Sequence, residues 1–177
     1  CHLQCKYCHN RDTWDMSGGE YKSVDEIFEK IKRYKNYINL SGGGVTVTGG
    51  EPLLQAKFLI ELFKKLKKAK IHTCIDTSGM VNLTEDIKEV LKYTDLVLLD
   101  IKHIDDEKCR KLVGFSNKQE KLKEFIRTLK TVEKVQVLPY HSMGRYKWEK
   151  LGLKYELEGI PDATQEDVDR AREILGI

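Results

Sequence analysis

The sequence predicts an α/β fold in which parallel strands alternate with helices. Short apolar runs alternate with longer segments whose apolar residues recur at helical spacing. Residues that cap helix N-termini precede three of the helical segments, and glycine or polar residues follow the predicted strands. Strands that are separated by helices pair in parallel, with the helices as crossovers. With 177 residues, of which 40% are apolar, we expect residues 1–177 to form a single domain.

The elements follow one another at regular intervals along the chain. Ser23 with Glu26 three residues later is the capping-box pattern that opens a helix. The continuous apolar run over 96–99 predicts a strand that is buried on both faces. In chain order we predict a helix over 24–38, a strand over 45–48, a helix over 54–66, a strand over 71–75, a helix after Thr84, a strand over 96–99, a helix over 122–129, a strand over 135–138 and a helix after Thr164.

Charge and hydropathy argue against two classes of partner. Lys plus Arg number 31 and Asp plus Glu number 28, so the net charge of +3 is too small to indicate a nucleic-acid partner. The basic residues over 64–68 share a predicted helix with Leu62, Phe63 and Leu66, which makes them its solvated face. No apolar run approaches the roughly 18 residues that a membrane span needs, so we expect no membrane association.

Three of the five cysteines are packed into the first eight residues. Cys1, Cys5 and Cys8 form a C-x3-C-x2-C motif, whereas Cys74 lies in a predicted strand and Cys109 in a probable helix. Three thiolates can hold three irons of a 4Fe–4S cluster and leave the fourth iron open to a substrate, because most electron-transfer clusters use four cysteines. The chain begins at Cys1 rather than at Met, so we expect it to be a piece of a longer protein.

The same spacing leaves other chemistry open. A structural zinc site would need a fourth ligand, and His2 or His9 is close enough in sequence to serve. Cys5 and Cys8 also have the spacing of a redox pair, although such pairs usually open a helix after a strand. A disulfide scaffold is not expected in a chain of this length with its own apolar core.

Polar residues gather where the chemistry of α/β proteins takes place, at the carboxyl ends of the predicted strands. Carboxylates and hydroxyls at the ends of two consecutive strands suit a hard cation, and an ordinary Asx turn is the alternative interpretation. The residues that follow the four strands are Gly49, Gly50 and Glu51, then Asp76 and Thr77, then Asp100 and Lys102, and finally His141.

The cysteine motif, with Tyr7 before its last cysteine, resembles the radical S-adenosylmethionine (SAM) superfamily. Within that superfamily, further segments are similar to the pyruvate formate-lyase activating enzymes. These segments are CHNRDTWD at 8–15, SGGGVT at 41–46, GGE at 49–51, HTCIDT at 72–77, LDIK at 99–102 and LPYH at 138–141. The resemblance covers most of the chain, and it implies an α/β fold of the partial (β/α)6 barrel type, open on one side where the partner's glycine loop enters.

The resemblance also implies a cofactor site. Cys1, Cys5 and Cys8 would hold a 4Fe–4S cluster, and SAM would bind beside it. The residues implied in SAM binding are Tyr7, which shields the cluster, Asn10, Gly49, Gly50 and Glu51 at the methionyl amino group, Asp100, Lys102 at the carboxylate and His141 at the ribose. A cation next to SAM would be held by Asp76, Thr77, Asp100 and the carbonyl of Leu98.

The activity that the resemblance implies is reductive. A flavodoxin-like donor reduces the cluster, SAM is cleaved, and the resulting 5′-deoxyadenosyl radical removes a hydrogen atom from a glycine of pyruvate formate-lyase. Because an open cluster edge reacts with oxygen, we expect an anaerobic, cytoplasmic setting. The alternatives are an activase of a different glycyl-radical enzyme, and a truncated, catalytically impaired cluster-binding module; zinc in place of iron would exclude every radical mechanism.

Two departures from the family pattern bear on activity. The segment before Cys1 would carry the first barrel strand, and roughly one further βα unit is expected where residues 117–121 join two helices. A strand without its neighbour presents an exposed edge. We therefore expect the domain to be incomplete at the N-terminus and near 117–121.

Overall fold

The structure is a computed structural model that describes residues 1–15, 18–103, 106–115 and 131–176. Its residues group into two compact units. The first, the sheet unit, comprises Cys1–His2 and Thr13–Ile101, and the second, the loop unit, comprises Leu3–Asp12 and Lys102–Ile177. None of the described helices is both long and apolar enough to cross a membrane.

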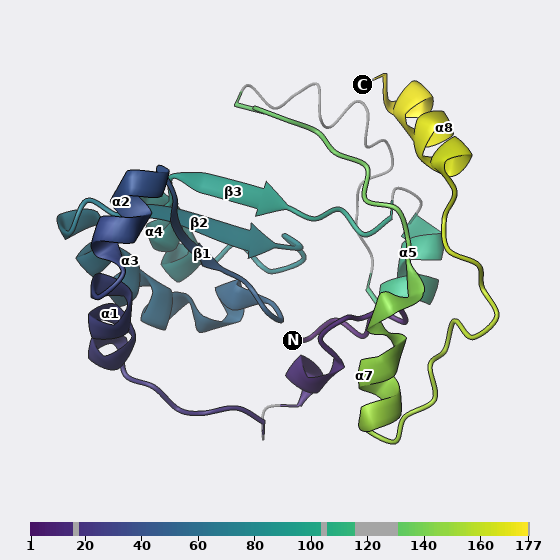
Figure 1. The fold of residues 1–177 in the computed structure, drawn as a ribbon, viewed down its shortest axis with the longest axis horizontal. Coiled ribbons are helices and arrows are strands. Elements are labelled where there is room, and N and C mark those ends of the chain that lie inside the picture. The colour runs from purple at the N-terminus through teal and green to yellow at the C-terminus, as the bar shows by residue number, and fades with distance from the viewer. Residues whose placement is uncertain (16–17, 104–105, 116–130, 177) are drawn as a thin grey trace. The chain divides into compact units, whose positions relative to one another are not determined.

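The sheet unit contains three parallel strands, β1 (Gly44–Val47), β2 (His72–Thr77) and β3 (Leu96–Leu99), in the order β1-β2-β3 (Figure 1). Val47 lies opposite Ile75, and Thr77 lies opposite Leu99. This register brings the carboxyl ends of the strands to one edge of the sheet. The α/β class and the parallel pairing are therefore confirmed. The sheet is not closed among the described residues, and the six-unit barrel stays a prediction.

The core of the sheet unit is built around the longest helix, α3 (Ala56–Lys68). Its apolar residues recur at helical spacing, and Phe63 and Leu66 are fully buried. They belong to one apolar cluster with Ile75 of β2 and Val90 of the helix α4 (Glu85–Lys92). Burial of each large apolar side chain contributes about 1.5 to 3 kcal/mol, so this cluster fixes β2, the central strand, against α3.

The predicted helix over 24–38 is divided in the structure into α1 (Val24–Lys32) and α2 (Lys35–Ser41). The Tyr34 amide donates to the carbonyl of Ile31, a 3₁₀-type bond that ends the first helix. Tyr34 has φ −97° and ψ 3°, outside the helical region, and is the N-cap residue of α2. The prediction of one continuous helix is therefore wrong, because the apolar periodicity persists across a break of two residues, Arg33 and Tyr34.

The predicted burial of β3 on both faces is also wrong. The exposed fractions of Val97, Leu98 and Leu99 are 42%, 47% and 40%. Among the described residues β3 pairs with a strand on one side only, so its other side has no neighbouring strand. The apolar run predicts the strand correctly but not its surroundings.

The loop unit holds the cysteine-rich segment against helices. The amides of Gln4 and Lys6 donate to the carbonyls of Val113 and Leu112, at the end of α5 (Asp106–Val113), over 3.0 and 2.9 Å. Carbonyls in the last turn of a helix lack intrahelical partners, so this segment caps α5. The remaining elements are η1 (Arg11–Trp14), which crosses between the two units, η3 (Ser142–Gly144), α7 (Arg145–Lys150) and α8 (Gln165–Leu175), besides the short η2 (Pro52–Gln55) of the sheet unit.

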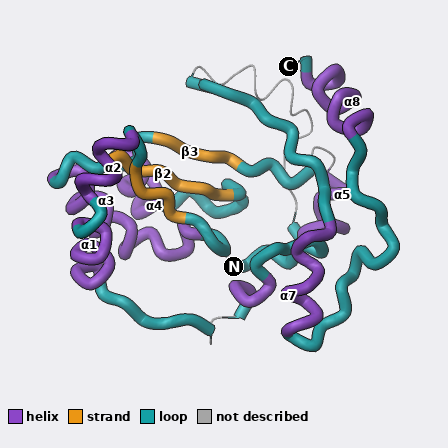
Figure 2. The backbone as a smooth tube through the Cα atoms, in the orientation of Figure 1, coloured by secondary structure: helices purple, strands orange, loops and turns teal. Residues whose placement is uncertain are grey.

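The predicted strand over 135–138 does not form. Residues 131–140 run without regular structure, as Figure 2 shows by colour, and Leu138 is 75% exposed. A strand is stabilised by the backbone groups of a neighbour, and the described residues of this segment pair with no strand. The predicted helix over 122–129 and the junction over 117–121 lie outside the described residues.

Candidate functional site

The turn after β1 is built from glycines for steric reasons. Gly49 has φ +123°, a conformation that side chains with a Cβ rarely adopt. A Cβ on Gly50 would lie 2.8 Å from the Cβ of Cys1 and 3.1 Å from its nitrogen. Within the sheet unit, therefore, the first cysteine packs directly on this turn, and glycine at position 50 leaves the space that Cys1 occupies.

Glu51, the last residue of that turn, is 5% exposed and fully engaged in hydrogen bonds. Its Oε1 accepts from the Thr77 hydroxyl over 2.7 Å and from the Leu53 amide over 3.1 Å. Its Oε2 accepts from the hydroxyl and the amide of Ser78 over 2.8 and 3.1 Å. A carboxylate has about four lone-pair sites, and here four donors use them. Glu51 thus ties the end of β1 to the end of β2, while its predicted contact with the SAM ammonium stays a prediction.

The residues predicted for a cation lie together at the same edge of the sheet. Asp76 is the register partner of Leu98 and accepts a 2.8 Å bond from the Thr48 hydroxyl. The amide of Asp100 donates to the carbonyl of Thr77 over 2.9 Å. Among the described residues, no three His, Cys, Asp or Glu side chains form a group arranged to hold a metal ion. The cation therefore gains no support from the geometry and stays a prediction.

The other two motif cysteines belong to the loop unit. Cys5 is buried, and its carbonyl accepts from the amide of Cys8 over 2.9 Å, which closes a tight turn. The amide of Asn10 points at the Cys8 sulfur over 3.4 Å. None of the five cysteines, all of which lie in the described residues, forms a disulfide.

Four residues predicted near SAM surround this turn within the loop unit. Tyr7 makes an edge contact with Tyr140, with ring centres 6.5 Å apart, and the Lys102 ammonium lies 6.0 Å from the centre of the Tyr7 ring. The rings of His9 and His141 are 4.5 Å apart. Burial lowers the pKa of His9, and the neighbouring positive charge of Lys102 acts in the same direction. The fourth residue, Asn10, accepts a bond from a lysine of α7.

A tryptophan that the sequence analysis did not single out contacts the motif directly. Trp148 of α7 is 3% exposed, and its indole N–H donates to the carbonyl oxygen of Cys8 over 2.9 Å. The guanidinium of Arg11 lies 5.4 Å from the centre of its ring. The available signal was an aromatic residue in the charged run RYKWEK, since such a side chain usually needs a buried surface.

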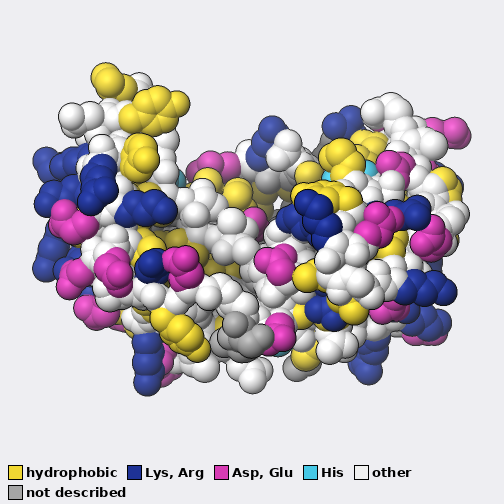
Figure 3. Space-filling view, turned by 60° about the horizontal axis from the view of Figure 1, so that its bottom comes forward, with side chains coloured by type: hydrophobic (Ala, Val, Ile, Leu, Met, Phe, Trp, Pro, Cys, Tyr) yellow, Lys and Arg dark blue, Asp and Glu magenta, His cyan; other side chains and the backbone are white. Residues whose placement is uncertain are grey.

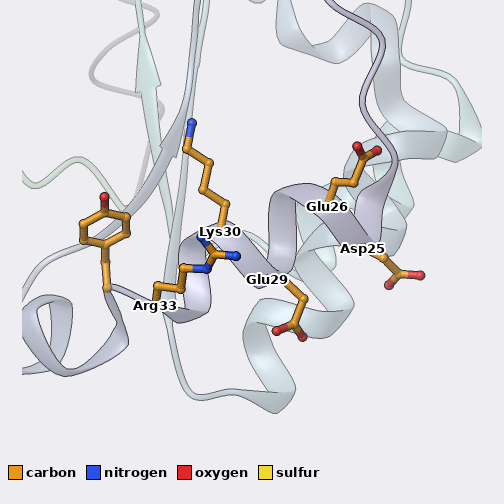
Figure 4. Close-up of a pocket in the computed structure, with 6 residues that line it drawn as sticks. Asp25, Glu26, Glu29, Lys30 and Arg33 are labelled. Atoms are coloured by element: carbon orange, nitrogen blue, oxygen red, sulfur yellow. The ribbon is translucent and has the colours of Figure 1, made fainter.

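An open hollow of about 550 Å³ lies elsewhere, along α1, and carries no comparable chemistry. Figure 4 shows Asp25 and Glu26 near one end of the helix and Lys30 and Arg33 near the other. Glu26 already closes the capping box, and Asp25 accepts from Lys65 over 2.6 Å. Figure 3 shows basic and acidic side chains mixed over the face in view, in keeping with the small net charge.

Comparison with known proteins decides the family. The model of the radical SAM superfamily matches residues 1–138. The chain belongs to the radical SAM superfamily. It is 38% identical to the pyruvate formate-lyase 1-activating enzyme of Escherichia coli, over 99% of this chain and 85% of that protein. It is 44% identical to the pyruvate formate-lyase-activating enzyme of Staphylococcus epidermidis, over 97% of this chain and 83% of the relative.

A solved structure agrees on the radical SAM fold. A domain of the pyruvate-formate lyase-activating enzyme from Bacteroides vulgatus superposes with a TM-score of 0.54 and 22% identity, over 76% of this chain and 93% of that domain. The alignment with the Escherichia coli protein runs over 208 positions, 31 more than the 177 residues of this chain. At least 31 positions of that relative therefore have no counterpart in this radical SAM chain, and the expected loss of one βα unit near 117–121 stays a prediction.

The chemistry of the donor set, three cysteine thiols, suits an iron–sulfur cluster. Among the described residues no three Cys, His, Asp or Glu side chains form a group that would hold a metal, so the assignment of these ligands stays a prediction. No disulfide ties up the three motif cysteines, and the amide of Asn10 donates to the Cys8 sulfur, as backbone amides around iron–sulfur clusters do. Glycine at position 50 keeps the space around Cys1 open. The zinc alternative has less support, because the His9 ring lies against that of His141, tilted by 40°, and His2 Nε2 lies 2.7 Å from the carbonyl of Met80.

Proposed function

We propose that this chain is a radical SAM activating enzyme that creates a glycyl radical on pyruvate formate-lyase. The observation that carries the proposal is the 38% to 44% identity to two pyruvate formate-lyase-activating enzymes over nearly the whole chain, with the cysteine motif intact. Its cofactors would be a 4Fe–4S cluster and SAM, and a flavodoxin-like protein would supply the electron.

The reaction divides between the cofactors and the chain. A bound cluster would supply the one electron for reductive cleavage of SAM, and SAM would supply the radical chemistry that removes a hydrogen atom from the partner's glycine. Cys1, Cys5 and Cys8 would hold the cluster. The chain's remaining task is to bind and orient SAM and to exclude water, and no acid or base on the protein is required.

The SAM-binding residues have distinct tasks in this proposal. The turn at Gly49 and Gly50 would let the backbone approach the methionyl amino group, and Glu51 would hold that turn through its bonds to the end of β2. Lys102 would balance the charge of the SAM carboxylate as a compact cation. His141, whose ring centre lies 4.5 Å from that of His9, would offer its ring to the ribose.

The test is anaerobic reconstitution with iron and sulfide, followed by dithionite and SAM, with 5′-deoxyadenosine as the measured product. We expect product from the wild-type chain and none when Cys1, Cys5 or Cys8 is changed to Ala. The matched control is Cys74→Ala, because Cys74 is a buried cysteine of β2 outside the motif. Retained product in a motif variant would refute the cluster assignment.

The partner is tested separately by adding pyruvate formate-lyase and recording the glycyl radical by electron paramagnetic resonance. Cleavage of SAM without that signal, in the presence of active partner protein, would favour the activase of a different glycyl-radical enzyme. Specificity for pyruvate formate-lyase would then be excluded while the radical chemistry stands.

A second candidate function is a cluster-binding module with impaired cleavage. It is favoured by the positions of the relative that this chain lacks and by the unpaired segment at residues 135–138. A stable cluster that yields no 5′-deoxyadenosine would support this candidate. Zinc bound in preference to iron would overturn both functions.

A further inference from the structure

The cysteine loop is held by a helix that lies beyond the region matched by the family model. That match ends at residue 138, and α7 spans Arg145–Lys150. Two side chains of α7 bond to the loop: Trp148 to the carbonyl of Cys8 over 2.9 Å, and Lys147 to Oδ1 of Asn10 over 3.0 Å. Both contacts lie within the loop unit.

Trp148 is packed against a second buried aromatic residue. Its ring meets Tyr155 edge-on, with centres 5.6 Å apart, and Tyr155 is itself 3% exposed. The hydroxyl of Tyr155 lies 3.0 Å from that of Tyr140, so the pair fixes the far side of the ring. The carbonyl of Trp148 accepts from the amide of Leu153 over 2.9 Å, which anchors the backbone at the end of α7.

The two bonds act on the residues that present one sulfur. The Cys8 carbonyl belongs to the peptide that joins Cys8 to His9, and the next amide along, that of Asn10, donates to the Cys8 sulfur over 3.4 Å. Trp148 fixes the first of these peptides, and Lys147 fixes the side chain of the residue that supplies the N–H. A Cβ on Gly144, just before α7, would lie 3.1 Å from the Cα of His9, so the helix packs against the loop backbone.

We infer that Trp148 is a positioning residue for the iron–sulfur cluster, with Lys147 in support; this rests on the proposed function. Trp148 acts in this role through the Cys8 loop. Its N–H holds the peptide that aims the Cys8 thiolate and keeps the N–H of Asn10 on that sulfur. Hydrogen bonds to cluster sulfurs help to set the reduction potential, and outer-shell partners of metal ligands typically affect affinity on the order of tenfold.

The test compares Trp148→Phe, which keeps a buried ring but removes the N–H, with Tyr146→Phe on the same helix, where the ring is 51% exposed. After anaerobic reconstitution, three readouts are taken: iron and sulfide content, the rate of iron loss to a chelator, and the reduction potential of the cluster. We expect Trp148→Phe to lose iron on the order of tenfold faster than wild type and to shift the potential to more negative values. Tyr146→Phe should match wild type.

A second pair keeps the inference testable if Trp148→Phe fails to fold, which circular dichroism of the unloaded protein would reveal. Lys147→Met should lower the potential in the same direction, whereas Lys150→Met, on the same helix, should not. Equal potentials and iron-loss rates in wild type, Trp148→Phe and Lys147→Met would overturn the inference and leave the proposed function standing. A wild-type chain that takes up no iron–sulfur cluster would overturn both.

Discussion

Replacing Glu51 by Gln tests whether the buried carboxylate holds the turn after β1 to the end of β2. Gln has nearly the same shape, so packing is kept while one acceptor oxygen becomes an NH₂ group. Whichever way the amide is turned, its hydrogens face a backbone amide, either that of Leu53 or that of Ser78, which can only donate. A hydroxyl beside it can rotate to accept, but a backbone N–H cannot.

The cost follows from that mismatch. One buried amide loses its acceptor, at about 1 to 3 kcal/mol, and the remaining bonds to Thr77 or Ser78 lose the strengthening that an ionised acceptor gives. We therefore expect Glu51→Gln to lower the free energy of unfolding by about 2 to 4 kcal/mol. With a urea dependence of about 2 kcal/mol per molar, the midpoint should fall by about 1 to 2 M.

The assay is urea unfolding of the reduced, unloaded protein at neutral pH, followed by circular dichroism, with hydrogen exchange of peptides that contain Ser78. Glu61→Gln is the control, because Glu61 is 62% exposed and its nearest lysine nitrogen is 3.9 Å away; it should cost under about 0.5 kcal/mol. A midpoint for Glu51→Gln equal to that of Glu61→Gln, with unchanged exchange at Ser78, would refute the reasoning.

Three further predictions follow from the sheet unit. The hydrogen bond from Lys67 holds the pKa of Asp95 at about 2, below its usual 3.8. The stabilisation that the ionised Asp95 gives to the folded state is therefore complete above about pH 4, and it is lost as the pH falls through 2. Asp95→Asn should lower the free energy of unfolding by about 1 to 2 kcal/mol at pH 7, after allowance for screening, and by under about 0.5 kcal/mol at pH 2. Equal losses at the two pH values in urea unfolding would contradict this. Gly50→Ala should reduce reconstituted iron on the order of tenfold, because its methyl group overlaps Cys1; unchanged iron content would contradict the steric argument. Leu98→Thr should change the urea midpoint little, since Leu98 is 47% exposed, and a loss above about 2 kcal/mol would indicate a buried strand.

Helix starts were predictable from sequence because they depend on neighbouring residues alone. Ser23, Thr84 and Thr164 each accept a bond from the amide three residues later, as predicted from the residue types. Two of these caps also have a carboxylate that bonds back to the cap residue. Hydrogen bonds between residues of the same helical turn can therefore be predicted without knowing the fold.

Strand surroundings were not predictable in the same way. The alternation over 135–138 has strand character, yet a strand forms only where a neighbour offers its backbone groups, and local sequence does not specify that neighbour. The run over 96–99 likewise predicts β3 but not its place at the edge of the sheet that the described residues form. Both errors concern what lies beside a segment rather than the segment itself.

The candidate site likewise contains residues that local sequence identifies and residues that it does not, and this difference bears on activity. The proposed ligands are recognisable from spacing, because Cys1, Cys5 and Cys8 lie within one short segment. Supporting groups are not, because any donor of suitable length can reach a backbone carbonyl, and Trp148 does so from 140 residues away. The supports for the Cys8 loop come from this chain's own α7, so they are independent of the positions that the relative has and this chain lacks. Cluster binding should therefore persist in this chain even if SAM cleavage is weak, and the two properties should be separable by measuring iron content and 5′-deoxyadenosine on the same sample.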